Sequence, residues 1–282
     1  MKNSPILILG SNGQLGREFT KQLSASGKKF LAPPENEFNI TDFPAITKQI
    51  LDASPSVIIN CAAYNLVDDA EENSEPAFLI NHKAVENLAN AAKQCNALLV
   101  HYGTDYVFDG NKGNLYTEED TPNPLGNYGK SKLAGEKAIQ DILKNYLIFR
   151  TSWVFGDGKQ NFIYKFRSWA EKNEVLKISA DETSVPTSTV DMVTATLTAI
   201  EKNLTGLYHL TNSGYASRYE WARYLAEILQ LKNIIIPVPV SSFKTKAQRP
   251  PFAAMSNAKI CSTIGIQLPD WKEAVKKFVE SV

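Results

Sequence analysis

The sequence has no long apolar run and few cysteines. No stretch approaches the roughly 18 apolar residues that a membrane-spanning helix requires, and the apolar run at residues 6–9 is too short for a signal peptide. The three cysteines, Cys61, Cys95 and Cys261, lie far apart and form no CxxC pair. These absences predict reduced thiols in a cytoplasmic protein that has no membrane partner.

An excess of charge and a metal-binding pattern are also missing. The 30 basic and 30 acidic side chains cancel, so the formal net charge is zero at pH 7. A neutral chain predicts no polyanionic partner such as a nucleic acid, and any anion site must be local. His82, His101 and His209 stand at no metal-ligand spacing to one another or to a cysteine. We therefore predict no metal and interpret each histidine as structural.

Short apolar runs alternate with amphipathic stretches through the first two thirds of the chain. The runs predict buried strands at residues 6–9, 30–32, 57–60, 98–102 and 146–150. Helical spacing follows the first strand as far as Gly27, and recurs at residues 77–94 and 128–143. This alternation is typical of parallel strands joined by right-handed crossovers. It predicts an α/β fold with a doubly wound parallel sheet.

A glycine-rich loop follows the first expected strand. Gly10, Gly13 and Gly16 form a GxxGxxG pattern that opens a periodic helix. Gly10 permits a sharp turn, Gly13 lets the backbone approach a pyrophosphate, and Gly16 lets the helix pack close to the sheet. The N-terminus of the helix then directs free N–H groups at the phosphates. The loop predicts a Rossmann-type dinucleotide site that also includes Asn12, Gln14 and Leu15.

The end of the second strand bears on the choice of cofactor. Residues 30–32 run into Pro33-Pro34-Glu35, so no acidic residue stands at the strand end to hold the ribose diol of NADH. Arg17, just beyond the loop, can instead contact a 2′-phosphate. We therefore favour NADPH, with NADH as the alternative. A solvated position on the helix is the other interpretation of Arg17.

The pattern of the chain changes near residue 155. We expect residues 1–155 to form an NAD(P)-binding Rossmann domain and residues 156–282 a smaller α+β cap that binds the substrate. Ser217 and Glu220 form a capping box before a helix, and prolines make residues 234–240 an edge strand or extended segment. Residues 189–212, a helix followed by a strand, are expected to return to the first domain.

Tyr128 and Lys132 form a YxxxK pair, whose side chains are neighbours on one helix face. We expect the lysine cation, with the charge of an oxidised nicotinamide, to lower the pKa of Tyr128 towards the range suited to proton transfer. Lys132 can also hold the nicotinamide ribose. Because the chain has 11 tyrosines, the pair alone is weak evidence. Thr104, after the strand at 98–102, can donate to the same carbonyl oxygen and polarise a ketone for hydride attack.

A series of motifs runs in order along nearly the whole chain. They are GSNGQLG at 10–16, NCAAY at 60–64, TDYVFDG at 104–110, YGKSKLAGE at 128–136, RTSWVFG at 150–156, VPT at 185–187, GLYHLTNSG at 206–214 and Arg249-Pro250. Together they resemble the dTDP-4-dehydrorhamnose reductase family of the extended short-chain dehydrogenases. The resemblance implies NADPH-dependent reduction of the 4-keto group of dTDP-6-deoxy-L-lyxo-4-hexulose to dTDP-L-rhamnose, a step of dTDP-rhamnose biosynthesis.

The resemblance also implies roles for individual residues. The implied catalytic set is Thr104, Tyr128 and Lys132. Further cofactor contacts are implied for Asn39, Ile40, Ala62, Ala63 and Tyr64. The implied substrate contacts are Thr104, Asp105, Tyr106, Trp153 and Arg249.

Several positions depart from the family pattern. Asn39 replaces an aspartate, although it can still bond an adenine amino group, and Gly103 replaces a common serine. Residues 181–185 and Phe252-Ala253 depart in the substrate half. These changes leave open a reductase or epimerase of a different activated sugar, and a non-catalytic regulatory subunit that binds a dinucleotide is a further alternative. Some members of the family form metal-bridged dimers through glutamates. No such cluster is evident near Leu15, so only a homodimer stays open.

Overall fold

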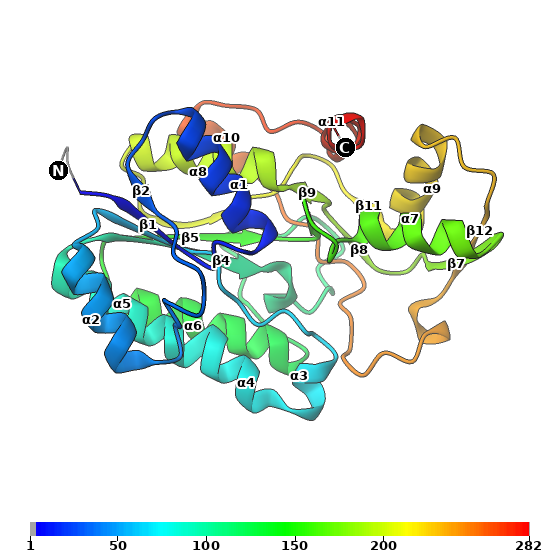
Figure 1. The fold of residues 1–282 in the computed structure, drawn as a ribbon. Helices are drawn as coiled ribbons and strands as arrows, with labels where there is room; N and C mark the ends of the chain where they lie inside the picture. Colours follow the sequence, from blue (N-terminus) through cyan, green and yellow to red (C-terminus); the bar gives the residue numbers. More distant parts are fainter. Residues whose placement is uncertain (1–3, 282) are drawn as a thin grey trace.

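The computed structural model describes residues 4–281, so the first three residues and the last residue of the predicted domains lie outside it. A six-stranded parallel sheet has the order β10-β5-β4-β3-β1-β2. Its strands are β1 (Ile6–Leu9), β2 (Phe30–Leu31), β3 (Val57–Asn60), β4 (Leu98–Thr104), β5 (Tyr146–Thr151) and β10 (Gly206–His209). The predicted doubly wound parallel sheet is confirmed (Figure 1).

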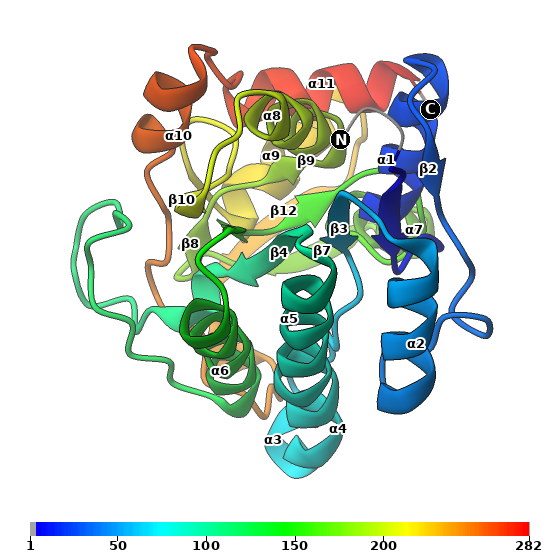
Figure 2. The same cartoon turned by 90° about the vertical axis from the view of Figure 1, so that its left-hand side faces the viewer.

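Helices cover both faces of this sheet (Figures 1 and 2). One face carries α1 (Gln14–Ala25), α8 (Thr189–Glu201) and α10 (Ala258–Ile264), and the other carries α2 (Phe43–Ala53), α5 (Ala84–Cys95) and α6 (Asn127–Ile142). Phe19 and Met192 belong to the core on the first face, and Ile46 and Leu88 to the core on the second. Burial on both faces explains why the strands are continuous apolar runs. Among residues 4–281, no helix is both long and apolar enough to cross a membrane.

Helix α2 was absent from the sequence-based predictions. Asp42 caps it by accepting a hydrogen bond from the Ala45 N–H at 3.2 Å, and Pro44 lies in its first turn. Ile46 and Ile50 are fully buried on one side. A capping aspartate and an early proline are ordinary signals of a helix start, so this helix was predictable.

The helix predicted at residues 77–94 is a compound element. After α3 (Asp69–Glu72), α4 (Ser74–Phe78) leads into a π-helical turn, η1 (Leu79–Lys83), which continues as α5. The buried Asn81 side chain in this turn accepts from the Tyr64 N–H at 2.9 Å and donates to the Tyr64 carbonyl at 3.0 Å. Such turns often occur at functional positions, and this one anchors the segment that follows β3.

A smaller part of the molecule lies beside the carboxyl ends of the central strands (Figure 1). Three two-stranded sheets pair β12 with β7, β11 with β8 and β6 with β9. The strands are β6 (Val154–Phe155), β7 (Val175–Ser179), β8 (Thr183–Ser184), β9 (Thr187–Ser188), β11 (Ala216–Ser217) and β12 (Ile234–Val238). The helical elements are α7 (Phe162–Lys172), α9 (Arg218–Ile228), the short 3-10 turn η3 (Val240–Ser242) and α11 (Trp271–Ser281). Phe155, Phe166, Trp221 and Trp271 form the centre of a separate apolar cluster.

Two details of this part agree with the sequence patterns. Ser217 and Glu220 form the predicted capping box at the start of α9. β12 is shorter than the predicted extended segment and pairs in parallel with β7. Helix α8 and strand β10 lie between these elements in the sequence, but they belong to the central sheet: α8 packs against α1, and β10 pairs with β5. The chain between residues 189 and 209 therefore lies with the central sheet.

Candidate active site

The glycine loop has no room for a side chain at Gly10 or Gly16. Gly10 has φ +72°, and a Cβ placed there would lie 2.6 Å from the Ala62 nitrogen. A Cβ on Gly16 would lie 2.3 Å from the Gly10 carbonyl oxygen. Gly13 caps α1 without a side-chain hydrogen bond, and the first turn of α1 contains no acidic residue. The helix N-terminus therefore keeps N–H groups available for an anion, which fits the pyrophosphate of a dinucleotide.

The loop lies where the strand order reverses, between β1 and β3. Ligands of doubly wound sheets bind at this crevice. Ala62, Ala63 and Tyr64 follow β3 directly. The Ala62 N–H donates to Asn60 Oδ1 at 3.1 Å, so the segment is held against Gly10.

Arg17 lies over the loop but already has protein partners. Its guanidinium donates to the carbonyls of Asn12 and Asp157, and its Nε is 3.6 Å from the Asp157 carboxylate. A contact with a 2′-phosphate would compete with Asp157. Gln14 Nε2 donates to the Val154 carbonyl at 3.2 Å, while Leu15 packs against the core beside the sheet.

The two residues expected near an adenine differ in burial. Asn39 is exposed, whereas Ile40 is buried in the core on the α2 side. Asn39 Oδ1 accepts from the Thr41 N–H at 2.9 Å and the Thr41 hydroxyl at 2.8 Å. Since both lone pairs of this oxygen are used, the side-chain amide nitrogen is the group that can face a base.

Thr104, Tyr128 and Lys132 come together at the carboxyl end of β4, which extends two residues beyond the predicted strand. All three are buried, with 5%, 8% and 2% of their surface exposed. Tyr128 lies in the first turn of α6, and its hydroxyl donates to Asn65 Oδ1 at 3.3 Å. The Tyr128 ring packs edge-on against Tyr106 at 5.7 Å.

Without a cofactor the Tyr128 pKa is raised, so the lowering expected with an oxidised nicotinamide stays a prediction for the loaded protein. Burial raises the pKa of Tyr128 above its usual range, and the nearby Thr104 hydroxyl opposes that rise only in part. Lys132 Nζ donates instead to the Tyr102 carbonyl at 2.6 Å. Burial also lowers the pKa of Lys132 to about 8. Burial is therefore the largest influence on the Tyr128 pKa, and the Asp105 and Tyr106 side chains raise it further.

The Thr104 hydroxyl is directed at Asp105. It donates to Asp105 Oδ1 at 3.1 Å and accepts from the Tyr106 N–H at 3.2 Å. Ser184 donates to the other Asp105 oxygen at 2.6 Å. Burial raises the pKa of Asp105 from 3.8 to about 6, although these hydrogen bonds oppose it. In this state the Thr104 proton is used within the protein, so donation to a substrate requires the hydroxyl to rotate.

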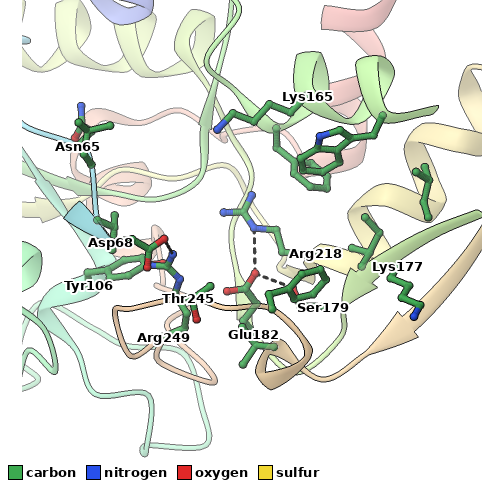
Figure 3. Close-up of a pocket in the computed structure, with 18 of the residues that line it drawn as sticks. Asn65, Asp68, Tyr106, Lys165, Lys177, Ser179, Glu182, Arg218, Thr245 and Arg249 are labelled. Atoms are coloured by element: carbon green, nitrogen blue, oxygen red, sulfur yellow. Dashed lines mark hydrogen bonds and ion pairs between the residues drawn. The ribbon is translucent and has the colours of Figure 1, made fainter. Parts of the chain in front are cut away.

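An open cavity of about 1210 Å³ lies beside this cluster, between the central sheet and α7, β7 and α9 (Figure 3). Tyr106 and Asn65 line it and connect it to Tyr128. Arg249 also lines it, with Nη2 2.7 Å from Asp68 Oδ2. Its Nη1 is buried and has no hydrogen-bond partner among the described residues.

Trp153 is placed differently from the expected pocket wall. It is not among the residues of the described chain that line the cavity. The Arg218 guanidinium covers its ring, with Cζ 3.6 Å from the ring centroid. Trp221 stacks near it at 5.9 Å. The cavity therefore meets Arg218 where the resemblance implied Trp153.

The sequence reasoning missed several lining residues: Asn65, Asp68, Lys165, Trp169 and Arg218. Glu182, which also lines the cavity, was noted only as a departure. A charged first residue of an amphipathic helix, such as Arg218, resembles any solvated helix end. The capping box at Ser217 marked the helix start but not the direction of the side chain.

The potential metal ligands of the chain are its His, Cys, Asp and Glu side chains. Within residues 4–281, no group of three or more His, Cys, Asp or Glu side chains is placed to hold a metal ion. Burial lowers the pKa of His209 to about 3 and holds the pKa of His101 well below its usual range. Both histidines are therefore neutral at pH 7.

Gly103, which departs from the family pattern, leaves room for the Glu136 carboxylate, because a Cβ at this position would lie 2.2 Å from Glu136 Oε1.

Known proteins resemble this chain over its full length. The family model described as RmlD substrate binding domain matches residues 3–282. The dTDP-4-dehydrorhamnose reductase of Burkholderia thailandensis is 34% identical over 287 residues, which cover 96% of each chain. A crystal structure of a dTDP-4-dehydrorhamnose reductase from Clostridium acetobutylicum has a TM-score of 0.95 at 34% identity and covers 98% of this chain and 99% of its own.

A second solved relative carries a ligand. The dTDP-4-dehydrorhamnose reductase from Bacillus anthracis, solved in complex with NADP, has a TM-score of 0.96 at 31% identity, with full coverage of both chains. The motifs of the sequence, the doubly wound sheet and these full-length similarities agree. The chain belongs to the RmlD substrate binding domain family, whose relatives found here include the dTDP-4-dehydrorhamnose reductases.

Proposed function

We propose that the protein is an oxidoreductase that uses NADPH to reduce the 4-keto group of dTDP-6-deoxy-L-lyxo-4-hexulose, giving dTDP-L-rhamnose. The observation that carries this proposal is the meeting of Thr104 and Tyr128 between an uncapped glycine loop and a large cavity. Full-length similarity to named dTDP-4-dehydrorhamnose reductases supports the substrate and the biosynthetic step.

Tyr128 is the proposed acid, because its neutral phenol can give a proton to the developing alkoxide at the sugar O4. Bound NADPH would supply the hydride. Burial keeps the phenol protonated beforehand, and Thr104 offers a second donor to the same oxygen once its hydroxyl turns from Asp105. Lys132, next to Tyr128 in the helix, would hold the nicotinamide ribose and stabilise the phenolate that remains.

The remaining predicted contacts are part of the same proposal. We assign the pyrophosphate to the glycine loop, the 2′-phosphate to Arg17, the adenine end to Asn39 and Ile40, and the nicotinamide end to residues 62–64. Tyr106 and Arg249, which line the cavity, would contact the nucleotide sugar directly. Asp105 and Trp153 would act indirectly: Asp105 would orient the Thr104 hydroxyl, and Trp153 would support the Arg218 guanidinium. The three cysteines form no disulfide, which fits a cytoplasmic enzyme.

Turnover with purified protein tests the proposal. Wild-type protein is expected to oxidise NADPH when given the dTDP-4-keto sugar. Tyr128→Phe should lose about 10²- to 10⁴-fold in kcat, the usual contribution of a general acid. Tyr164→Phe is the matched control, because Tyr164 is 43% exposed on α7 and does not line the cavity. Equal rates for wild type and Tyr128→Phe would reject the catalytic assignment.

A related reductase for another activated sugar is the second candidate. Glu182 and Arg218 favour keeping it, since both charges face the cavity where a substrate would lie. A panel that varies the base and the sugar separates the two. Faster turnover of a sugar linked to another nucleotide would replace the first candidate with the second.

A further inference from the structure

Arg218 presents a guanidinium group whose outer donors are free within the described chain. Its Nε lies 3.5 Å from Glu182 Oε1, and Glu182 Oε1 accepts from the Ser179 hydroxyl at 2.8 Å. No other dashed contact reaches Arg218 in Figure 3, where its end points into the cavity towards the same space as Lys165. A guanidinium fixed at Nε keeps both Nη atoms available, and this planar fork matches the oxygens of a phosphate.

The surrounding aromatic rings fix the orientation of this guanidinium. Its Cζ lies 3.6 Å from the centroid of the Trp153 ring, and the centroids of Phe162 and Trp221 are 5.1 and 5.5 Å away. The Arg218 side chain is 22% exposed, so its charge is only partly screened by water. An arginine that is stacked and held at one end loses little further freedom when it binds an anion.

The position of Arg218 along the cavity indicates which part of a ligand it meets. Arg218 directly follows β11, which pairs with β8, and Ser184 of β8 donates to Asp105, so Arg218 lies on the side of the cavity towards Thr104. Trp169 and Phe243, each 40% exposed, also line the cavity and suit stacking of a base. The link between a reacting sugar and a stacked base is a diphosphate.

We infer that Arg218, held in place by Glu182, is a specificity-determining residue that binds the diphosphate of the nucleotide sugar. This inference rests on the proposed function, because it assumes a substrate with a nucleoside diphosphate. Lys165 supplies a second cation on the same side of the cavity. Arg249 differs, because Asp68 already partners its Nη2. Glu182 acts as a positioning residue through Arg218.

Binding of simple probes to the NADPH-loaded protein tests this inference. Wild type should bind dTDP and UDP more tightly than thymidine. Arg218→Met should weaken dTDP by about 10- to 100-fold, as for loss of charged hydrogen bonds, and should leave thymidine unchanged. Arg223→Met is the matched control, because Arg223 is exposed on the same helix outside this cavity. Unchanged NADPH affinity of each variant shows that it is folded.

Two Glu182 variants test the positioning role. Glu182→Ala releases Nε and should weaken dTDP several-fold, with KM for the nucleotide sugar rising more than kcat falls. Glu182→Gln keeps an oxygen near Nε and the same side-chain shape, and should restore dTDP binding. Equal dTDP affinity of Glu182→Ala and wild type would reject this role.

Two further outcomes distinguish the inference from the function on which it rests. If wild type prefers dTDP to thymidine and Arg218→Met keeps that preference in full, the inference is wrong but the proposed function stands. If wild type binds dTDP and UDP no more tightly than thymidine, both are overturned.

Discussion

The two ends of the active site offer an anion different kinds of partner. At the glycine loop the available donors are backbone N–H groups, and the nearest cation, Arg17, is partnered by Asp157. In the cavity, the donors are side chains, foremost Arg218, whose outer nitrogens have no partner among residues 4–281. A backbone site depends on close approach at its glycines, whereas a side-chain site depends on how each cation is held. The two should therefore respond to different substitutions.

The largest effect is expected at the backbone site. Gly10→Ala places a Cβ 2.6 Å from the Ala62 nitrogen at φ +72°, so the loop must distort. We expect a loss of about 2–5 kcal/mol, shared between stability and NADPH affinity. Gly113→Ala is the control, because Gly113 has φ +69° but no atom within 4 Å. Titration of NADPH by fluorescence measures the cofactor affinity of the two variants, and denaturant unfolding measures their stability. Similar NADPH affinities in the two variants would show that the close approach at Gly10 is unimportant.

A buried arginine in an ion pair sharpens the contrast with Arg218. Arg150 donates three hydrogen bonds to Glu136, at 2.8 to 3.2 Å, and is 4% exposed. Arg150→Met leaves the carboxylate buried without its partner, which should cost about 3–5 kcal/mol of unfolding free energy. Denaturant unfolding measures the loss, with Lys137→Met on the exposed side of α6 as the control. A cost no larger than that of Arg218→Met would remove the distinction between a structural and a ligand-binding arginine.

Asp105, on the cavity side, should make the free energy of unfolding depend on pH. Its pKa is raised from 3.8 to about 6, so the folded protein keeps a proton that the unfolded chain releases between these values. The contribution of Asp105 to the free energy of unfolding should therefore fall by about 3 kcal/mol as pH rises from about 4 to 6, and stay level above that range. The lowered pKa values of His101 and His209 act in the opposite direction over the same range, so Asp105 is tested by a difference between two proteins. The difference in unfolding free energy between wild type and Asp105→Asn, measured at a series of pH values, should change by this amount. A difference that stays constant between pH 4 and 6 would contradict the raised pKa of Asp105.

The smallest effect is expected for Arg17. Its side chain is 40% exposed and already paired, so its contact with a 2′-phosphate should contribute only about 1 kcal/mol. Arg17→Met should lower the preference for NADPH over NADH without changing NADH binding, while Lys21→Met on the same helix changes neither. Unaltered selectivity in Arg17→Met would assign 2′-phosphate recognition to other residues.

The parts of the site beside the central sheet were largely predictable from local sequence patterns. Gly10, Gly13 and Gly16 are recognisable because the loop imposes their spacing, and YxxxK is recognisable because one helix carries both residues. Strand β4 was predicted two residues too short, since Gly103 and Thr104 do not continue its apolar run. The compound helix with the Asn81 turn was missed for a similar reason, because its hydrogen bonds to Tyr64 join distant segments.

The cavity was harder to predict because its members come from separate elements. Arg218 begins α9, Glu182 precedes β8 and Lys165 lies on α7. No sequence spacing relates them, and tertiary contacts with Trp153 and Glu182 hold the arginine in the cavity. The raised pKa of Tyr128 in the protein without cofactor was not predicted, for a related reason. A YxxxK pair shows proximity along a helix, but the Tyr102 carbonyl that binds Lys132 and the depth of burial are tertiary features.

Transfer of deuterium tests the central claim most directly. Wild-type protein is incubated with the dTDP-4-keto sugar and NADPH deuterated at the nicotinamide C4, and the product is examined by mass spectrometry and NMR. We predict one deuterium at the sugar C4 for each NADPH consumed when the transferred face is labelled. A product without deuterium at C4, or an isomerised sugar formed without NADPH consumption, would contradict reduction of the 4-keto group at this site.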